Sequence, residues 1–195
     1  FIIYKTYFMA KSTQATANRP RPVMKNKDDE TLLKELFIEE LRDIYWAEKH
    51  LTKVMPRLLK AATSPQLAHA FEQHLMQTME QITRVELAFE MLELHPRASK
   101  CEAMEGLAKE CQQMLQDMPK GSSALDAGLI ICAQKIEHYE IASYGSLVQL
   151  AKTMGRNDLA NMLHLNLVEE KETDELLTEL AVSGINLDAV HEEGQ

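Results

Sequence analysis

Acidic side chains interrupt the apolar face of one long predicted helix in the second half of the chain. Between residues 129 and 150, apolar residues recur at steps of three and four, the spacing of one helical face. Glu140 lies in the middle of that face, and Glu137 lies one turn before it. An ionised carboxylate in a dry core costs several kcal/mol unless something compensates it. A divalent metal, shared protons or a hydrogen-bond network could each do so.

The three other long predicted helices carry similar interruptions near their midpoints. Because helices of similar length pack side by side in a bundle, we expect these interruptions to meet at one depth. Carboxylate and imidazole groups are suitable ligands for iron or manganese. The sequence therefore predicts a set of candidate metal ligands, namely Glu48, His74, Glu137, Glu140, Glu170 and Asp174.

The arrangement differs from the usual di-metal carboxylate bundle, which has Glu on two helices and Glu-x-x-His on two others. None of the seven histidines has Glu three residues before it. This absence favours a non-enzymatic bundle whose polar centre is structural or vestigial. The alternative is a di-iron or di-manganese protein that acts on peroxide or oxygen, or stores metal. No catalytic residue is predicted under either hypothesis.

The composition indicates an all-α protein, because Gly and Pro are scarce while good helix formers are abundant. We expect a flexible basic tail over 1–27, a four-helix bundle over 28–183 and a loose end over 184–195. A shorter helix near 100–118, capped by Ser99, should lie between the second and third long helices. Ser64 should cap the second long helix, and Ser123 with Asp126 the third.

Charge and cysteine content exclude several classes of partner. The net charge is −9, and the first 27 residues hold six basic residues and no acid, which leaves 15 basic against 30 acidic residues elsewhere. Such an acidic body argues against nucleic acid or an anionic membrane as the main partner. No apolar run is long enough for a membrane span. Three cysteines without CxxC spacing indicate buried thiols in a reducing cytoplasm.

Four segments resemble the bacterial YciF/YciE-type stress proteins: LRDIYWAEKHL, CEAMEGL, QKIEHYEIASYGSL and EEKETDELLTEL. The likeness covers about residues 30–182. It implies a ferritin-like bundle related to rubrerythrin-type di-iron proteins, induction under stress, and a homodimer with the short extra helix at its interface. We expect the stripe from Met104 to Met118 to form that interface. The family usually has acids just before Thr78, where this chain has Met76 and Gln77.

Overall fold

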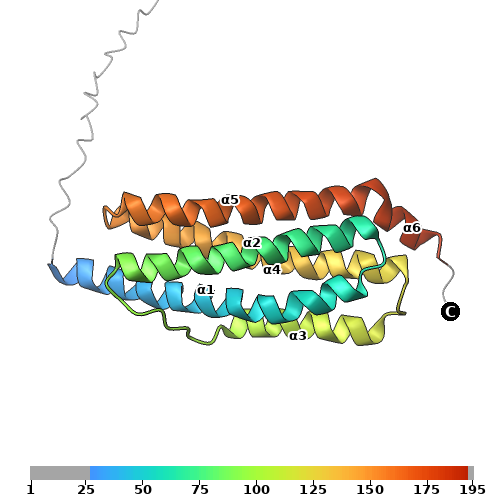
Figure 1. The fold of residues 1–195 in the computed structure, drawn as a ribbon, viewed down its shortest axis with the longest axis horizontal. Helices are drawn as coiled ribbons and strands as arrows, with labels where there is room; N and C mark the ends of the chain where they lie inside the picture. Colours follow the sequence, from blue (N-terminus) through green and yellow to red (C-terminus); the bar gives the residue numbers. More distant parts are fainter. Residues whose placement is uncertain (1–26, 193–195) are drawn as a thin grey trace, which may run out of the picture.

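The computed structural model describes residues 27–192, and every regular element in that range is helical. Four long helices run side by side as a bundle, and the shorter α3 lies along one edge (Figure 1). The all-helical prediction is confirmed, with the extra helix between the second and third long helices. The elements are α1 (Lys27–Ala61), α2 (Pro65–Met91), α3 (Glu102–Asp117), α4 (Ser123–Thr153), α5 (Asn157–Leu180), a π-helical turn (Ala181–Ile185) and α6 (Asn186–Val190).

The apolar core occupies both ends of the bundle and leaves a polar middle. Toward one end, Phe37, Leu41 and Phe89 are fully buried, and toward the other end Leu58 and Leu67 are almost completely buried. Burial of such side chains is the main driving force for packing the helices. None of the helices in residues 27–192 combines the length and apolar character needed to cross a bilayer.

The helix starts differ in detail from the predicted caps. Ser64 caps α2 as expected, because its Oγ accepts a hydrogen bond from the Leu67 amide. The cap of α4 is Ser122 rather than Ser123. The cap of α3 is Cys101, whose Sγ accepts from the Met104 amide at 3.3 Å, so the Ser99 prediction is wrong.

The α3 helix packs against its own chain. It contacts α1 and α4, and this packing buries Met104 completely and leaves Cys111 1% exposed. Side chains buried inside one chain cannot form the core of an interface with another. The prediction that the Met104–Met118 stripe makes a dimer interface is therefore wrong for these two residues.

The C-terminal segment is more ordered than the sequence predicted. Residues 184–190, expected to be loose, continue the helical path, and Ile185 is buried. The Glu192 carboxylate accepts hydrogen bonds from the amides of Ser123 at 2.6 Å and Ala124 at 3.0 Å, at the start of α4. A helix N-terminus favours a carboxylate in that position. The predicted basic tail lies outside the described residues except for Lys27, where α1 begins.

Candidate metal centre

Five of the predicted ligands are buried in the polar middle of the bundle. Glu48 comes from α1, His74 from α2, Glu137 and Glu140 from α4, and Glu170 from α5, and none is more than 4% exposed. One potential ligand atom from each of His74, Glu137, Glu140 and Glu170 lies within 4.8 Å of the others. Glu48 lies beside this group and raises the pKa of Glu140 by charge repulsion.

The His74 ring connects three of the helices. Its Nε2 lies 3.1 Å from Oε1 of Glu137 on α4 and 3.9 Å from Oε2 of Glu170 on α5. Its Nδ1 lies 3.5 Å from Oγ1 of Thr173, whose hydroxyl donates to the Glu169 carbonyl at 3.0 Å. The Thr173 contact therefore holds the ring at Nδ1, with Nε2 facing the carboxylates, where a metal ligand would need to be.

The cluster holds more acceptors than donors. Tyr144 Oη donates to Oε1 of Glu48, and Gln81 Nε2 donates to Oε1 of Glu170. Native proteins pair the great majority of their buried polar atoms. Within the described residues, five carboxylate oxygens of this cluster have no hydrogen-bond partner: Glu48 Oε2, Glu137 Oε2, both oxygens of Glu140, and Glu170 Oε2.

Burial and mutual repulsion make the carboxyl groups resist ionisation. Burial raises the pKa of Glu140 well above its ordinary value, and the charges of Glu170 and Glu48 raise it further. Burial and the charge of Glu170 do the same to the pKa of Glu48. Burial raises the pKa of Glu137 to about 8. The cluster therefore needs either protons or a cation to be stable at neutral pH.

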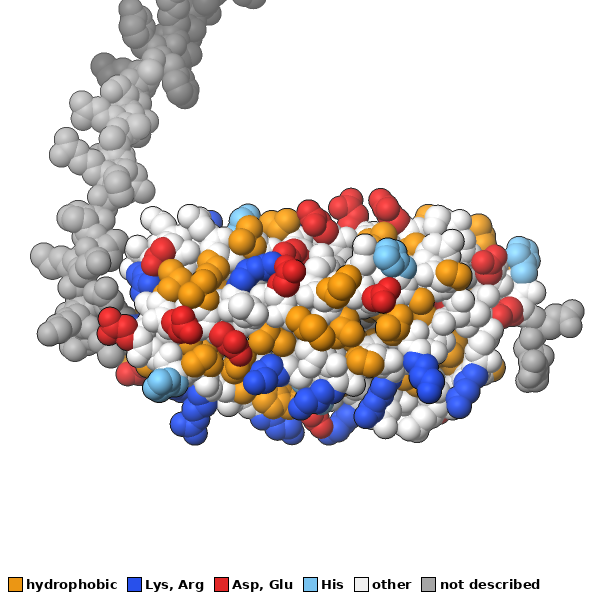
Figure 2. Space-filling model, viewed as in Figure 1, with side chains coloured by type: hydrophobic (Ala, Val, Ile, Leu, Met, Phe, Trp, Pro, Cys, Tyr) orange, Lys and Arg blue, Asp and Glu red, His pale blue; other side chains and the backbone are white. Residues whose placement is uncertain are grey.

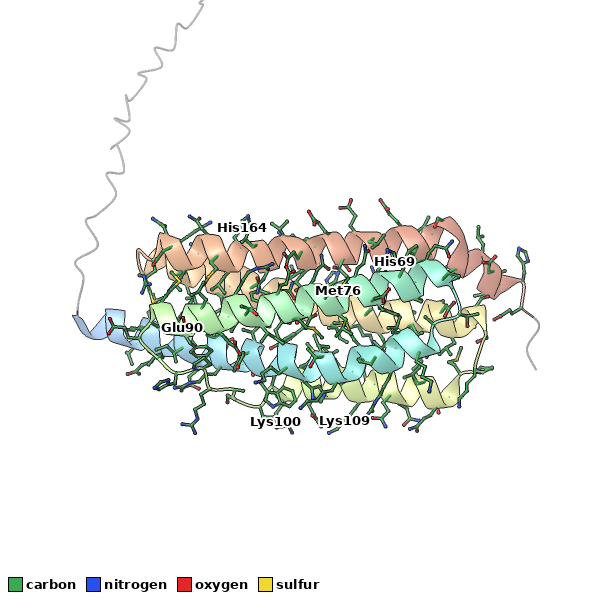
Figure 3. The ribbon with its side chains drawn as sticks, in the orientation of Figure 1. His69, Met76, Glu90, Lys100, Lys109 and His164 are labelled. Carbon is green, nitrogen blue, oxygen red and sulfur yellow. The ribbon has the colours of Figure 1, made fainter. Side chains whose placement is uncertain are left out.

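Asp174 and position 76, which the sequence also singled out, both lie outside this cluster. The Asp174 carboxylate lies 3.2 Å from Nε2 of Gln134 and 3.3 Å from Nε2 of His138, so it belongs to a partly exposed network at the α4–α5 surface. Met76 is 57% exposed and projects outward from α2 (Figure 3). An acid at position 76 would therefore lie on the surface.

Two further residues, Thr173 and Tyr144, support the site and were not among those predicted from the sequence. Thr173 follows Glu170 by three residues, where the di-metal template would place histidine. In this chain the imidazole comes from α2 instead, so a Glu–His pair forms across two helices. Tyr144 follows Glu140 by four residues and shares its helical face. Thr173 and Tyr144 could therefore have been identified from the sequence as polar residues three or four positions after a candidate ligand.

A cleft between α2 and α5 approaches the cluster from solvent. Its volume is about 450 Å³. Thr173, whose Oγ1 contacts His74, forms part of its wall, so one side chain separates the cleft from the buried group. Gln77, half-buried, lines the same wall. The outer lining includes two acids that attract cations, Glu80 and Glu172.

The chain is similar to several known proteins over most of its length. Residues 32–190 match the family described as Domain of unknown function (DUF892). Protein YciF of Escherichia coli strain K12 is 42% identical over 155 residues, which cover 79% of this chain and 93% of that protein.

Solved structures show the same fold. The E. coli stress protein YciF superposes with a TM-score of 0.75 and covers 79% of this chain and 97% of that one, at 42% identity. The YcfI protein of Rhodopseudomonas palustris gives a TM-score of 0.73 at 36% identity, covering 75% of this chain and 92% of that one. These matches span nearly the whole bundle, including α3. The chain therefore belongs to the DUF892 family, together with YciF.

Proposed function

We propose that this protein is a stress-response helical bundle whose buried carboxylates bind a divalent iron or manganese ion. The observation that carries the proposal is the set of five carboxylate oxygens, from three helices, that lack a partner within the described residues and lie around His74. The kinship with the E. coli stress protein YciF supports the stress-related role.

The residues present fit such an ion. Three carboxylates and one imidazole form a hard oxygen and nitrogen donor set, which suits iron or manganese. His74, Glu137, Glu140 and Glu170 would hold the ion, and Thr173 would orient the imidazole through Nδ1. Four ionised glutamates, counting Glu48, carry enough charge to balance two divalent cations.

A bound iron or manganese ion would supply Lewis-acid and redox chemistry. The protein's own groups would keep water out and control protons around it. Tyr144 holds a proton against Glu48, because burial and the Glu48 charge raise the pKa of its hydroxyl well above the ordinary value. Gln81 fixes one oxygen of Glu170, which leaves the other oxygen free to bind.

Calorimetric titration with Mn(II) under anaerobic conditions tests the proposal. The wild-type chain should bind Mn(II) stoichiometrically, because binding removes the repulsion among buried carboxylates. Glu140→Gln should weaken binding at least tenfold, since it removes a ligand charge at the centre. Glu90→Gln makes the same change in charge at an exposed position of α2 and should bind like wild type. A wild-type chain that takes up no Mn(II) or Fe(II) would refute the proposal.

A metal-free, non-enzymatic bundle with a purely structural polar centre is the second candidate. The hydrogen bonds from Tyr144 to Glu48 and from Gln81 to Glu170 favour it, as do the raised pKa values. Protonated carboxyl groups would then donate to one another and need no ion. In that case Glu140→Gln would alter neither metal content nor the thermal response to added metal.

The homodimer implied by the family resemblance is also part of this proposal. Because Met104 and Cys111 are buried within the chain, a dimer interface cannot use the inner face of α3. Light scattering coupled to size-exclusion chromatography should give twice the mass of the 195-residue chain. A monomer at micromolar concentration would remove this part of the proposal without affecting the metal centre.

A further inference from the structure

A pair of cysteines, Cys111 on α3 and Cys132 on α4, lies where these two helices pack against each other. Neither is among the candidate metal ligands. Cys111 is 1% exposed and Cys132 is 5% exposed. Both carry free thiols, and the two helices that bear them pack against each other. Two thiols that face each other across a helix contact differ from a lone buried cysteine, because each is the nearest reaction partner of the other.

The helix packing holds the two sulfurs in register. A Cβ added at Gly128 would lie 2.1 Å from Sδ of Met114, so α3 approaches α4 closely at this level. Cys132 is four residues after Gly128, and Cys111 is three residues before Met114, so each cysteine shares a face with one member of that contact. Lys135 Nζ and Glu110 Oε2 pair at 2.8 Å across the same two helices.

The two thiols influence each other's ionisation. The neighbouring Cys111 thiol and the positive charge of Lys135 lower the pKa of Cys132, whereas the neighbouring Cys132 thiol and burial raise the pKa of Cys111. Each thiol is therefore placed to react with the other once that one is oxidised.

A solvent-accessible cleft reaches Cys111 from the edge of the bundle. The cleft, between α1 and α3, has a volume of about 230 Å³, and Cys111 forms part of its wall beside His50, Lys53 and Arg57. Figure 2 shows basic side chains gathered along this edge, and Lys109, also a wall residue, projects from it in Figure 3. A molecule as small as hydrogen peroxide can enter a space of this size.

We propose that Cys111 and Cys132 form a redox-active pair that a hydroperoxide converts into an intramolecular disulfide joining α3 to α4. One thiolate of the pair attacks one peroxide oxygen, the O–O bond breaks, and the leaving oxygen departs as water or an alcohol after taking up a proton. The resulting sulfenic acid is attacked by the sulfur of the other cysteine, the S–O bond breaks, and water leaves with the proton of that second thiol. Two thiols lose two electrons, and the hydroperoxide gains them.

The third cysteine is an internal control. Cys101 is also 1% exposed, but its Sγ is engaged elsewhere: it donates to Oη of Tyr139 at 3.1 Å and accepts from the Met104 amide at 3.3 Å. It has no thiol partner among the described residues and should stay reduced. Unfolded chains should behave differently, because the short loop between Cys101 and Cys111 favours that pairing once the fold is lost.

Peptide mapping tests this inference directly, since trypsin places each cysteine on its own peptide, 101–109, 110–120 and 121–135. The folded full-length chain is treated with hydrogen peroxide, its remaining thiols are alkylated, and the non-reduced digest is analysed by mass spectrometry. Peptides 110–120 and 121–135 should appear as one linked species, two hydrogens lighter than their sum. Peptide 101–109 should be recovered alkylated.

Two comparisons make the result decisive. Cys101→Ser should form the same linked species, whereas Cys132→Ser should leave Cys111 without an intramolecular partner. Chain unfolded in guanidinium should lose the selectivity. If the wild-type chain keeps all three thiols, oxidises Cys101 first, or accumulates sulfinic acid on Cys132 without the link, the inference is overturned. The wild-type readout suffices even where a variant folds poorly, and it does not depend on metal binding.

Discussion

Two buried carboxylates on α4 show how differently this bundle treats its acids. Asp126, near the start of α4, is 3% exposed, and its two oxygens accept hydrogen bonds from the amides of Thr63 at 2.8 Å and Ser64 at 2.7 Å. Glu140, four turns later, is 1% exposed, and neither of its oxygens has a partner within the described residues. The first acid closes the turn between α1 and α2. The second is buried in a position where its charge opposes folding.

The comparison indicates that burial alone does not identify a functional acid. What distinguishes Glu140 is the absence of donors together with the presence of other acids, because a buried charge without compensation destabilises the fold. An acid retained under those conditions needs a compensating ion or proton. Substitutions at the two positions should therefore have opposite effects on stability.

The largest expected effect is at Asp126. Asp126→Ala should lower the free energy of unfolding by about 2 kcal/mol, because it removes the charged acceptor of two backbone N–H groups in the α1–α2 turn. Urea denaturation with and without added Mn(II) measures it, and the loss should be similar in both. Asp188→Ala, at an exposed position of α6, is the matched control and should change stability little. An Asp126→Ala chain as stable as wild type would mean that the carboxylate does not hold the turn.

The next effect is at Glu140 in metal-free protein. Its pKa is raised in the folded state above the ordinary value of 4.5, so the native chain holds a proton that the unfolded chain releases. Stability should therefore fall as the pH rises above about 4.5, and Glu137, whose pKa burial raises to about 8, contributes to the same fall. Glu140→Gln removes this contribution and should raise stability near neutral pH by about 2 kcal/mol.

Urea denaturation across that pH range, with a chelator present, measures this difference. The stabilisation by Glu140→Gln should be small at the acid end and grow toward the alkaline end. A variant that is less stable than metal-free wild type near neutral pH would show that the Glu140 carboxylate is satisfied in a way this structure does not display.

The smallest effect should come from Thr173, which contacts the candidate ligands without being one. Thr173→Val keeps the shape of the side chain but removes the oxygen beside His74 Nδ1, so the imidazole is less firmly oriented. Mn(II) affinity should fall about tenfold, with little change in stability. Thr83→Val is the matched control, because the Thr83 hydroxyl makes the same type of bond to a carbonyl four residues earlier, far from His74 Nδ1. Equal losses of affinity in both variants would argue against the orienting role.

The fold was readily predictable from the sequence, whereas only part of the site was. The apolar stripes and Ser64-Pro65 predicted the long helices, because periodicity and caps are local properties. The inward positions of Glu48, His74, Glu140 and Glu170 followed from the same periodicity. The misplacement of Asp174 had a different cause. Residues four apart share a helical face only broadly, and the rotation of α5 against α4 decides which of two acids faces inward.

Contacts between distant segments could not be predicted. Nothing local to Asp126 indicates that it binds the amides of Thr63 and Ser64, because the contact depends on how α4 packs against the α1–α2 turn. The pairing of Cys111 with Cys132 likewise depends on the packing of α3 against α4, which Gly128 permits. The missing Glu-x-x-His motif likewise gave no information on where an imidazole would lie, since His74 reaches Glu170 from a different helix.

Anomalous diffraction from crystals grown with Mn(II) would show whether the buried carboxylates bind a metal ion. We expect a strong peak inside the bundle, within bonding distance of His74 Nε2 and of carboxylate oxygens from Glu137, Glu140 and Glu170, and its loss in Glu140→Gln. A wild-type crystal with no peak among these four residues, or with bound Mn(II) only at surface carboxylates such as Asp174, would contradict this expectation.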